Sequence, residues 1–341
     1  MLKKDLPITF EALTPIWTGD WSRKSDTRIL ETGILGSLRW WTEILVRGMG
    51  VAVEDPAESG HVYDDPTCLG DPVERLFGFT GWRRRFRLEV DGHASLRPEG
   101  RYALTDPPVP WAPGKDRPPT WQFPSTAHDG ATTLRLIGAS DKDAAIIQGA
   151  LAFAAAVGAL GAKSQHGCGI IRYEMPAPAL FLEWLAGLWK AGGGGAVNPG
   201  LPSLRDLFVG EYTADRIRDV DTFYARYNMR ATFRSTEGAT SGEIVRQTAI
   251  RHAIFGSLGN DRQGSKVCVS FPFEADGARR IRVWGWLPQS PTRASHLAGI
   301  RAAMEHHFTA SRWLDLADWY PSSVLPEIAE TLQKGVPWTT K

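Results

Sequence analysis

The spacing of hydrophobic residues changes in a fixed order along the first half of this chain. Residues 8–12 alternate between apolar and polar, as a strand with one buried face does. From Ile34 to Met49 apolar residues recur every three or four positions, which indicates one face of a helix. The later elements are strands at 85–90 and 132–137, a buried helix at 141–158 and a strand at 168–175. This order predicts a split βαβ, or ferredoxin-like, module with the open antiparallel sheet of RRM domains.

Four consecutive glycines, Gly192 to Gly195, interrupt these patterns. Because they carry no side chains to bury, they predict a linker. After the glycines, residues 223–233 alternate strictly and predict a first strand, with Arg226, Arg230 and Arg234 in a line on one sheet face. The remaining predictions are a helix at 241–253, strands at 267–273 and 281–286, and helices at 295–308 and 326–334. No fourth strand is evident, so this module is either incomplete or completed by another segment.

The predicted fold class is therefore α+β, with two ferredoxin-like (RRM-like, βαββαβ) modules in tandem. A length of 341 residues suits two domains. We place the N-terminal module, which includes a glycine-rich loop, at residues 1–190, and the C-terminal module, with C-terminal helices, at residues 201–341. Proline and tryptophan crowd residues 107–124, which predicts an irregular insertion.

Composition excludes several classes of protein. With 43% hydrophobic and 23% charged residues, the chain is typical of a folded globular protein. Its longest apolar run, residues 150–162, is too short to span a bilayer, and no leader sequence is evident, so we expect no membrane contact and a cytoplasmic location. Cys68, Cys168 and Cys268 lie far apart, which predicts reduced, buried thiols. A net charge of +1 is uninformative, since a nucleic-acid binder needs a basic surface and not a basic average.

Motifs of the common enzyme classes are absent from the sequence. It contains no Walker motif, HExxH, GxSxG elbow or Rossmann glycine pattern in a strand-helix context. The histidines that we considered as acids, bases or ligands lack ligand spacing; they are His61, His128, His166, His252, His306 and His307. We therefore predict no catalytic residue, no metal ligand and no cofactor.

Residues 161–169 form the most informative stretch, Gly-Ala-Lys-Ser-Gln-His-Gly-Cys-Gly. Its glycines allow close approach of a partner to the backbone, and its side chains offer donors to phosphate. The predicted contacts are Lys163, Ser164, Gln165 and His166. The alternative is a helix C-cap and turn whose polar residues face water, and the sequence leaves both open.

Clustered cations beside aromatic residues suggest further RNA contacts. Arg83, Arg84 and Arg85 follow Trp82, a pairing that suits a phosphate backbone with stacked bases, although a solvated strand face is the alternative. Arg39 lies beside Trp40, but with Glu43 and Arg47 it has the four-residue spacing of helical ion pairs. The other predicted RNA-binding residues are Arg23, Lys24, Arg28, Trp40, Arg226 and Arg230.

Several segments together resemble the RAMP superfamily of CRISPR proteins, and within it the first-numbered RAMP subunit of the type III-B Cmr complex. They are residues 14–19 (TPIWTG), 31–41 (ETGILGSLRWW), 76–82 (LFGFTGW), the loop 161–169, and 254–256 (IFG) and 284–288 (WGWLP). The helix motif from Gly33 to Trp41 is the most specific of these, because of its length and its two adjacent tryptophans. Lys163 and His166 depart from the family, which tends to have arginines there.

The resemblance implies paired ferredoxin-like modules in a multi-subunit effector, in which another RAMP subunit cleaves the target. We accordingly predict a non-catalytic RNA-binding subunit of a type III-B (Cmr) ribonucleoprotein in antiviral defence, whose partners are CRISPR RNA, target RNA and other Cmr-type subunits. Two alternatives remain open. One is a RAMP-type endoribonuclease, because a histidine or aspartate lies in each basic loop, and the other is a protein-only scaffold, which the many tryptophans would also suit.

Overall fold

The computed structural model describes residues 4–18, 29–53, 55, 70–92, 95–96, 100–103, 120–123, 126–193, 198, 200–213, 216–234, 238–257 and 263–317. Three predicted RNA contacts, Arg23, Lys24 and Arg28, lie outside the described residues. So do Cys68 and the helix predicted at 326–334.

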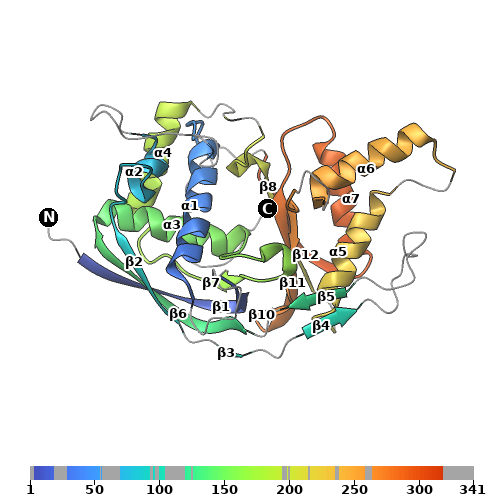
Figure 1. Ribbon diagram of the computed structural model, residues 1–341, viewed down its shortest axis with the longest axis horizontal. Helices are drawn as coiled ribbons and strands as arrows, with labels where there is room; N and C mark the ends of the chain where they lie inside the picture. Colours follow the sequence, from blue (N-terminus) through green and yellow to red (C-terminus); the bar gives the residue numbers. More distant parts are fainter. Residues whose placement is uncertain are drawn as a thin grey trace.

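The first half forms an antiparallel sheet covered by helices (Figure 1). Its strands run in the order β2-β6-β1-β7, with β3 also paired to β6. A separate pair, β4 and β5, includes residues 120–123, which we had expected to be irregular. The elements are β1 (Lys4–Ile16), α1 (Glu31–Gly48), α2 (Pro72–Phe77), β2 (Arg87–Gly92), β3 (Ser95–Leu96), β4 (Gly100–Ala103), β5 (Thr120–Phe123), β6 (Thr126–Ala139), α3 (Asp141–Val157), β7 (Ile171–Arg172) and α4 (Ala179–Gly192).

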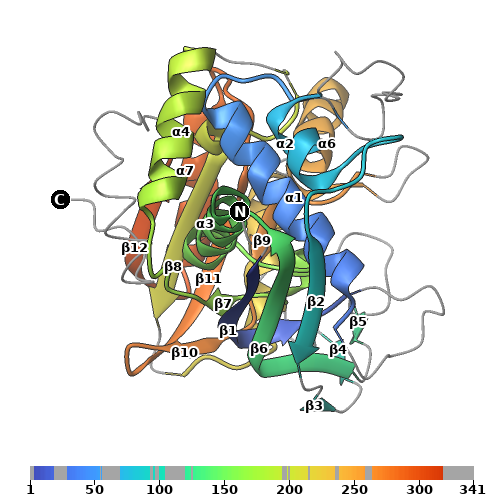
Figure 2. The same ribbon diagram turned by 90° about the vertical axis from the view of Figure 1, so that its left-hand side faces the viewer.

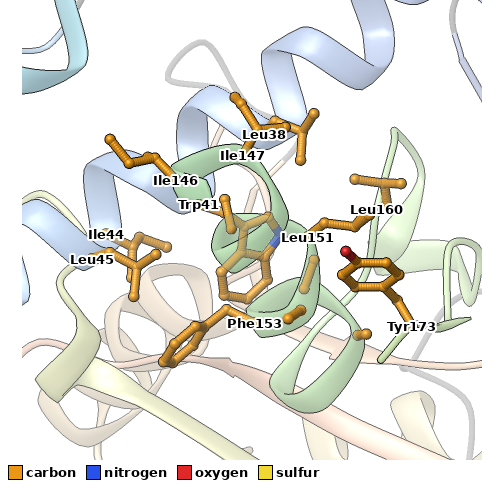
Figure 3. Packing of buried hydrophobic residues seen from close by; sticks show 14 of the residues in the cluster. Leu38, Trp41, Ile44, Leu45, Ile146, Ile147, Leu151, Phe153, Leu160 and Tyr173 are labelled. Carbon is orange, nitrogen blue, oxygen red and sulfur yellow. The ribbon is translucent and has the colours of Figure 1, made fainter. Parts of the chain in front are cut away.

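One face of this sheet is buried and the other faces solvent. Ile8 and Phe10 of β1 point inward, whereas Thr9 and Glu11 are exposed. Both ribbon views place α1, α3 and α4 on the buried side (Figures 1 and 2). In the core, Trp41 of α1 lies against α3, as Figure 3 shows. The alternation seen in the sequence therefore has its ordinary cause, a sheet with one wet face.

The second half repeats the strand order of the first. Its sheet runs β10-β11-β8-β12, with β9 also paired to β11, and all pairs are antiparallel. Strand β12 supplies the fourth strand that the sequence did not reveal. The elements are a 3-10 turn (Leu204–Asp206), β8 (Leu207–Thr213), α5 (Asp221–Thr232), α6 (Ser241–Phe255), β9 (Val267–Val269), β10 (Phe273–Ala275), β11 (Ala278–Trp286), α7 (Arg293–Glu305) and β12 (Thr309–Asp315).

The strand predicted at residues 223–233 is wrong, because this segment is helix α5. Its alternation is the sum of two helical stripes. Phe223 and Tyr227 pack into one hydrophobic cluster, while Ala225 and Met229 pack into another. Since each stripe has a four-residue spacing and they are offset by two, every second residue is apolar. Arg226 and Arg230 therefore share a helix face and not a sheet face, and Arg234 lies two residues past the end of the helix.

The second sheet is buried on both faces. Leu207 and Val209 of β8 face the core of the first half, whereas Phe208 and Tyr212 face α5 and α7. Figure 1 shows this sheet standing between the helices of the two halves. The division at residues 190 and 201 stays a prediction, since one hydrophobic cluster contains side chains from both halves.

Candidate nucleic-acid interface

Backbone hydrogen bonds close the glycine-rich loop onto the residue before it and onto the residue that follows β1. Leu160 N donates to Gly169 O at 2.8 Å, and Ala162 N donates to Trp17 O at 2.8 Å. Gly169 has a φ of +93°, and a Cβ there would lie 2.2 Å from Leu160 O. Any larger residue would therefore open this loop.

The loop also contacts the second half of the chain. Ser265 N donates to Gln165 Oε1 at 3.3 Å, and Phe271 N donates to Gly167 O at 2.9 Å. Ser164 Oγ lies 4.0 Å from the Sγ of Cys268, a buried free thiol, as is Cys168. The predicted contact residues Ser164 and Gln165 thus have protein neighbours, and the loop lies at the junction of the two halves.

Two residues of the loop differ in their charge at neutral pH. Lys163 adopts the left-handed conformation, its Nζ lies 4.1 Å from the centroid of the Trp17 ring, and burial lowers its pKa. Burial, followed by the charges of Arg226 and Lys163, lowers the pKa of His166 to about 4. His166 is therefore neutral at pH 7 and offers hydrogen bonds but no charge.

A line of cations continues from the loop onto α5 and α6. Burial and the charge of Arg230 lower the pKa of Arg226 to about 10, and Arg226 Nη1 is buried with no hydrogen-bond partner among the described residues. Burial and the charges of Arg251 and Arg234 likewise lower the pKa of Arg230. We call Lys163, Arg226, Arg230 and Arg251 the cationic row.

Within the described part of the chain, no member of the cationic row forms an ion pair. Partly buried positive charges that repel one another destabilise a fold unless an anion compensates them. Such groups are candidates for a binding site. The sequence indicated Lys163, Arg226 and Arg230 separately but not Arg251, and no local pattern could join them because they come from three segments.

The exposed face of the first sheet has a different electrostatic character. Its arginines are paired: Arg172 with Glu11 at 2.6 Å, Arg87 with Glu89 at 3.0 Å, and Arg135 with both Asp5 and Glu89. Neighbouring carboxylates neutralise these cations, so this face offers little attraction to a phosphate backbone.

Of the other predicted arginines, some are paired with carboxylates and some are exposed without an ion pair among the described residues. Arg39 donates to Glu43 and to Gly78 O, both at 3.0 Å, and Glu43 also pairs with Arg47, as the spacing predicted. Arg85 pairs with Asp143, in the first turn of α3 and at the opposite end of that helix from the glycine-rich loop. Arg83 and Arg84 are exposed.

Residues 9–172 match the family model of the RAMP superfamily. This segment is therefore similar to a RAMP domain. The match runs from β1 to β7, so the matched segment includes the glycine-rich loop but not α5 or α6. The cationic row joins residues inside the matched segment to residues outside it.

The search of curated proteins finds no match to the chain. Among solved structures, Cmr1 from Pyrococcus furiosus in its apo form has 16% identity and a TM-score of 0.43, over 94% of this chain and 96% of that one. Type III-B Cmr-beta bound to cognate target RNA and AMPPnP, in the presence of ssDNA, contains a chain with 11% identity and a TM-score of 0.46, over 89% and 99%. Another Cmr-beta chain, from a structure with cognate target RNA, has 9% identity and a TM-score of 0.43, over 89% and 100%. At these scores the likenesses indicate no ligand for this chain.

None of the described helices has the length and the apolar character that a bilayer span requires. Among the described residues, no three histidine, cysteine, aspartate or glutamate side chains gather as ligands for a metal ion.

Proposed function

We propose that this chain is a non-catalytic, RNA-binding subunit of a type III-B CRISPR effector. In this proposal its two sheets are ferredoxin-like modules in tandem, and its partners are CRISPR RNA, target RNA and other Cmr-type subunits in the cytoplasm. The match of residues 9–172 to the RAMP family model and the motifs that resemble the first-numbered Cmr RAMP subunit support the assignment to this class of effector.

The observation that carries the proposal is the cationic row. Arg226, Arg230 and Arg251 keep positive charge at neutral pH although they are partly buried and close to one another. A phosphate backbone would supply the missing negative charge and would release counterions as it bound. Lys163, beside Trp17, extends the same track to the glycine-rich loop.

The structure changes which residues we propose as the RNA contacts. The main contacts are Lys163, Arg226, Arg230 and Arg251, with His166 as an uncharged hydrogen-bonding group. Arg83 and Arg84 remain proposed secondary contacts, because both are exposed and neither forms an ion pair in the part of the chain that is described.

Binding of single-stranded RNA, measured by fluorescence anisotropy across a salt series, tests this proposal. The variant carries Lys163→Ala, Arg226→Gln and Arg230→Gln. Each lost phosphate contact should reduce the salt slope of log K by about 0.7, so the slope should fall by about 2. The affinity should fall at least tenfold at low salt.

The matched control removes the same number of positive charges from the exposed sheet face: Arg87→Gln, Arg135→Gln and Arg172→Gln. These arginines are already paired with carboxylates, so RNA affinity should change less than threefold. Equal losses in the two triple variants would contradict the proposed site. Gel analysis of the same mixtures tests the enzyme alternative, which specific RNA cleavage lost in His166→Ala would support.

A further inference from the structure

A cavity lined by four tryptophans lies beside the glycine-rich loop. Its volume is about 190 Å³, below the roughly 300–1,000 Å³ of pockets for drug-sized ligands. Its walls come from both halves of the chain. They comprise Ser37, Trp40 and Trp41 of α1, Ala159, Gly161 and Ser164 after α3, Ser265, Lys266 and Cys268 at β9, and Trp284 and Trp286 of β11.

Trp41 and Trp284 form the rigid part of this tryptophan pocket. Both rings are buried, and their centroids are 5.9 Å apart with a tilt of 34°. Trp41 Nε1 donates to Ala159 O at 2.9 Å, which fixes the indole. Gly158 gives this ring its space, since a Cβ there would lie 2.2 Å from Trp41. Trp41, which has no exposed surface, therefore holds Trp284 in place, and Trp284 forms the rigid aromatic wall of the pocket.

The rim of the pocket is partly exposed and carries a positive charge. Trp40 and Trp286 are half-buried, and Trp40 meets Trp41 edge to face at a centroid distance of 5.0 Å. Lys266 Nζ lies 5.1 Å from the centroid of the Trp286 ring and donates to Ala253 O at 2.6 Å. Ser164 and Ser265 add hydroxyl groups to the lining.

These features select the chemistry of the occupant. Stacking surfaces made of indole rings favour a flat, π-bonded group of one or two rings. The ammonium of Lys266 already lies over Trp286, so a cationic ligand such as a methylated amine would meet like charge. The Ser164 hydroxyl and the ammonium can instead donate to carbonyl oxygens and ring nitrogens, whereas the Ser265 hydroxyl already donates to Val267 O.

We propose that the tryptophan pocket binds a single unpaired nucleobase of RNA. This inference rests on the proposed function and assigns a base site to it. Ser164 lines the pocket and directly follows Lys163, the first member of the cationic row. A nucleotide whose base enters the pocket therefore has its phosphate within reach of the row.

The first test compares two single-stranded probes of equal length, one an RNA and the other the same ribose-phosphate backbone with abasic positions. The wild-type protein should bind the RNA about tenfold more tightly, because stacking of one base is worth about 1–3 kcal/mol. RNA binding should also quench tryptophan fluorescence. Equal affinities for the two probes would overturn the nucleobase site.

Variants at the rim locate the effect. Trp286→Ala should reduce the preference for bases at least fivefold, and Trp286→Phe should keep most of it because it retains a ring. Trp189→Ala, a half-buried tryptophan on α4 outside the pocket, is the matched control and should keep the full preference. Thermal unfolding shows whether each variant is folded. If Trp286→Ala is unfolded, the base preference of Trp286→Phe is compared with that of the wild type and of Trp189→Ala. The pocket is supported if only Trp286→Phe loses part of the preference.

Failure of the nucleobase site is distinguishable from failure of the proposed function. If the wild-type protein binds neither probe, the function itself is wrong. If it binds both equally through the cationic row, only the nucleobase site is wrong. Retention of the full base preference by Trp286→Ala would likewise overturn the pocket as its origin.

Discussion

Two groups of arginines near the junction of the halves differ in how their charges are balanced. Glu211 of β8 accepts from Arg282 at 2.7 Å and from Arg280 at 3.1 Å. Arg282 also donates to Ala155 O and Gly158 O at the end of α3. Members of the cationic row, in contrast, have no carboxylate partner among the described residues.

This difference separates the charges that hold the two halves of the chain together from the charges that we propose bind RNA. Burial alone would raise the pKa of the Glu211 carboxyl, but the charges of Arg282, Arg312 and Arg280 and the hydrogen bonds from Arg282 hold it below its ordinary value. That cluster stabilises the junction as a unit, and loss of either partner would leave the other charge buried. The cationic row lowers stability by itself and is explained by an external anion.

The largest expected effect on the free energy of unfolding comes from the buried cluster of Glu211 and its arginine partners. Arg282→Met should lower the free energy of unfolding by about 3–5 kcal/mol, because it leaves the buried Glu211 short of its main partner. Denaturant unfolding measures this change. Arg172→Met, which breaks the exposed pair with Glu11, should cost only about 0.2–1 kcal/mol. Similar losses of unfolding free energy in the two variants would show that the buried cluster contributes no more to stability than the exposed pair.

Removing an arginine from the cationic row should change the free energy of unfolding less, and in the opposite direction. Arg226→Met removes a desolvated cation without a partner at Nη1, so the free energy of unfolding should stay constant or rise. Its RNA affinity should nevertheless fall at low salt. Unfolding curves and anisotropy on the same preparation check both results. A destabilised variant with wild-type RNA affinity would show that Arg226 is a structural residue.

The smallest effect concerns pH. The pKa of His166 is lowered to about 4 by burial and by neighbouring cations. Between pH 6.5 and 4 the unfolded chain therefore binds more protons at this residue, so its contribution to stability is present above pH 6.5 and is lost as the pH falls toward 4. His166→Gln should lessen this acid sensitivity in thermal unfolding scans.

RNA affinity should be independent of pH between 6 and 8, because His166 stays neutral there. Anisotropy at pH 6, 7 and 8 in one buffer system checks this expectation. A tenfold gain at pH 6 that disappears in His166→Gln would mean that His166 becomes charged on the RNA, and it would then count among the cationic contacts.

Much of the first half was predictable from the sequence. Its sheet has one buried and one exposed face, so alternation located the strands, and the four-residue stripe from Ile34 located α1. Strand β8 was not predictable in this way, because it is buried on both faces and its residues do not alternate. Helix α5 was mistaken for a strand because two apolar stripes overlap along it.

The candidate site was predictable only in part. The glycine-rich loop stands out in the sequence, and Arg226 and Arg230 were named, although on the wrong element. Arg251, Lys266, Trp284 and Trp286 were not singled out as RNA contacts, since no local pattern connects them with Lys163.

By itself, the sequence determined the local periods, the helical spacing of Arg39, Glu43 and Arg47, and the glycines that permit a tight loop at 161–169. The tertiary structure decided which cations have a carboxylate beside them and which rings meet in one pocket. The physical reason is distance along the chain: Glu211 and Arg282, or Trp41 and Trp284, interact only after two sheets and their helices have packed.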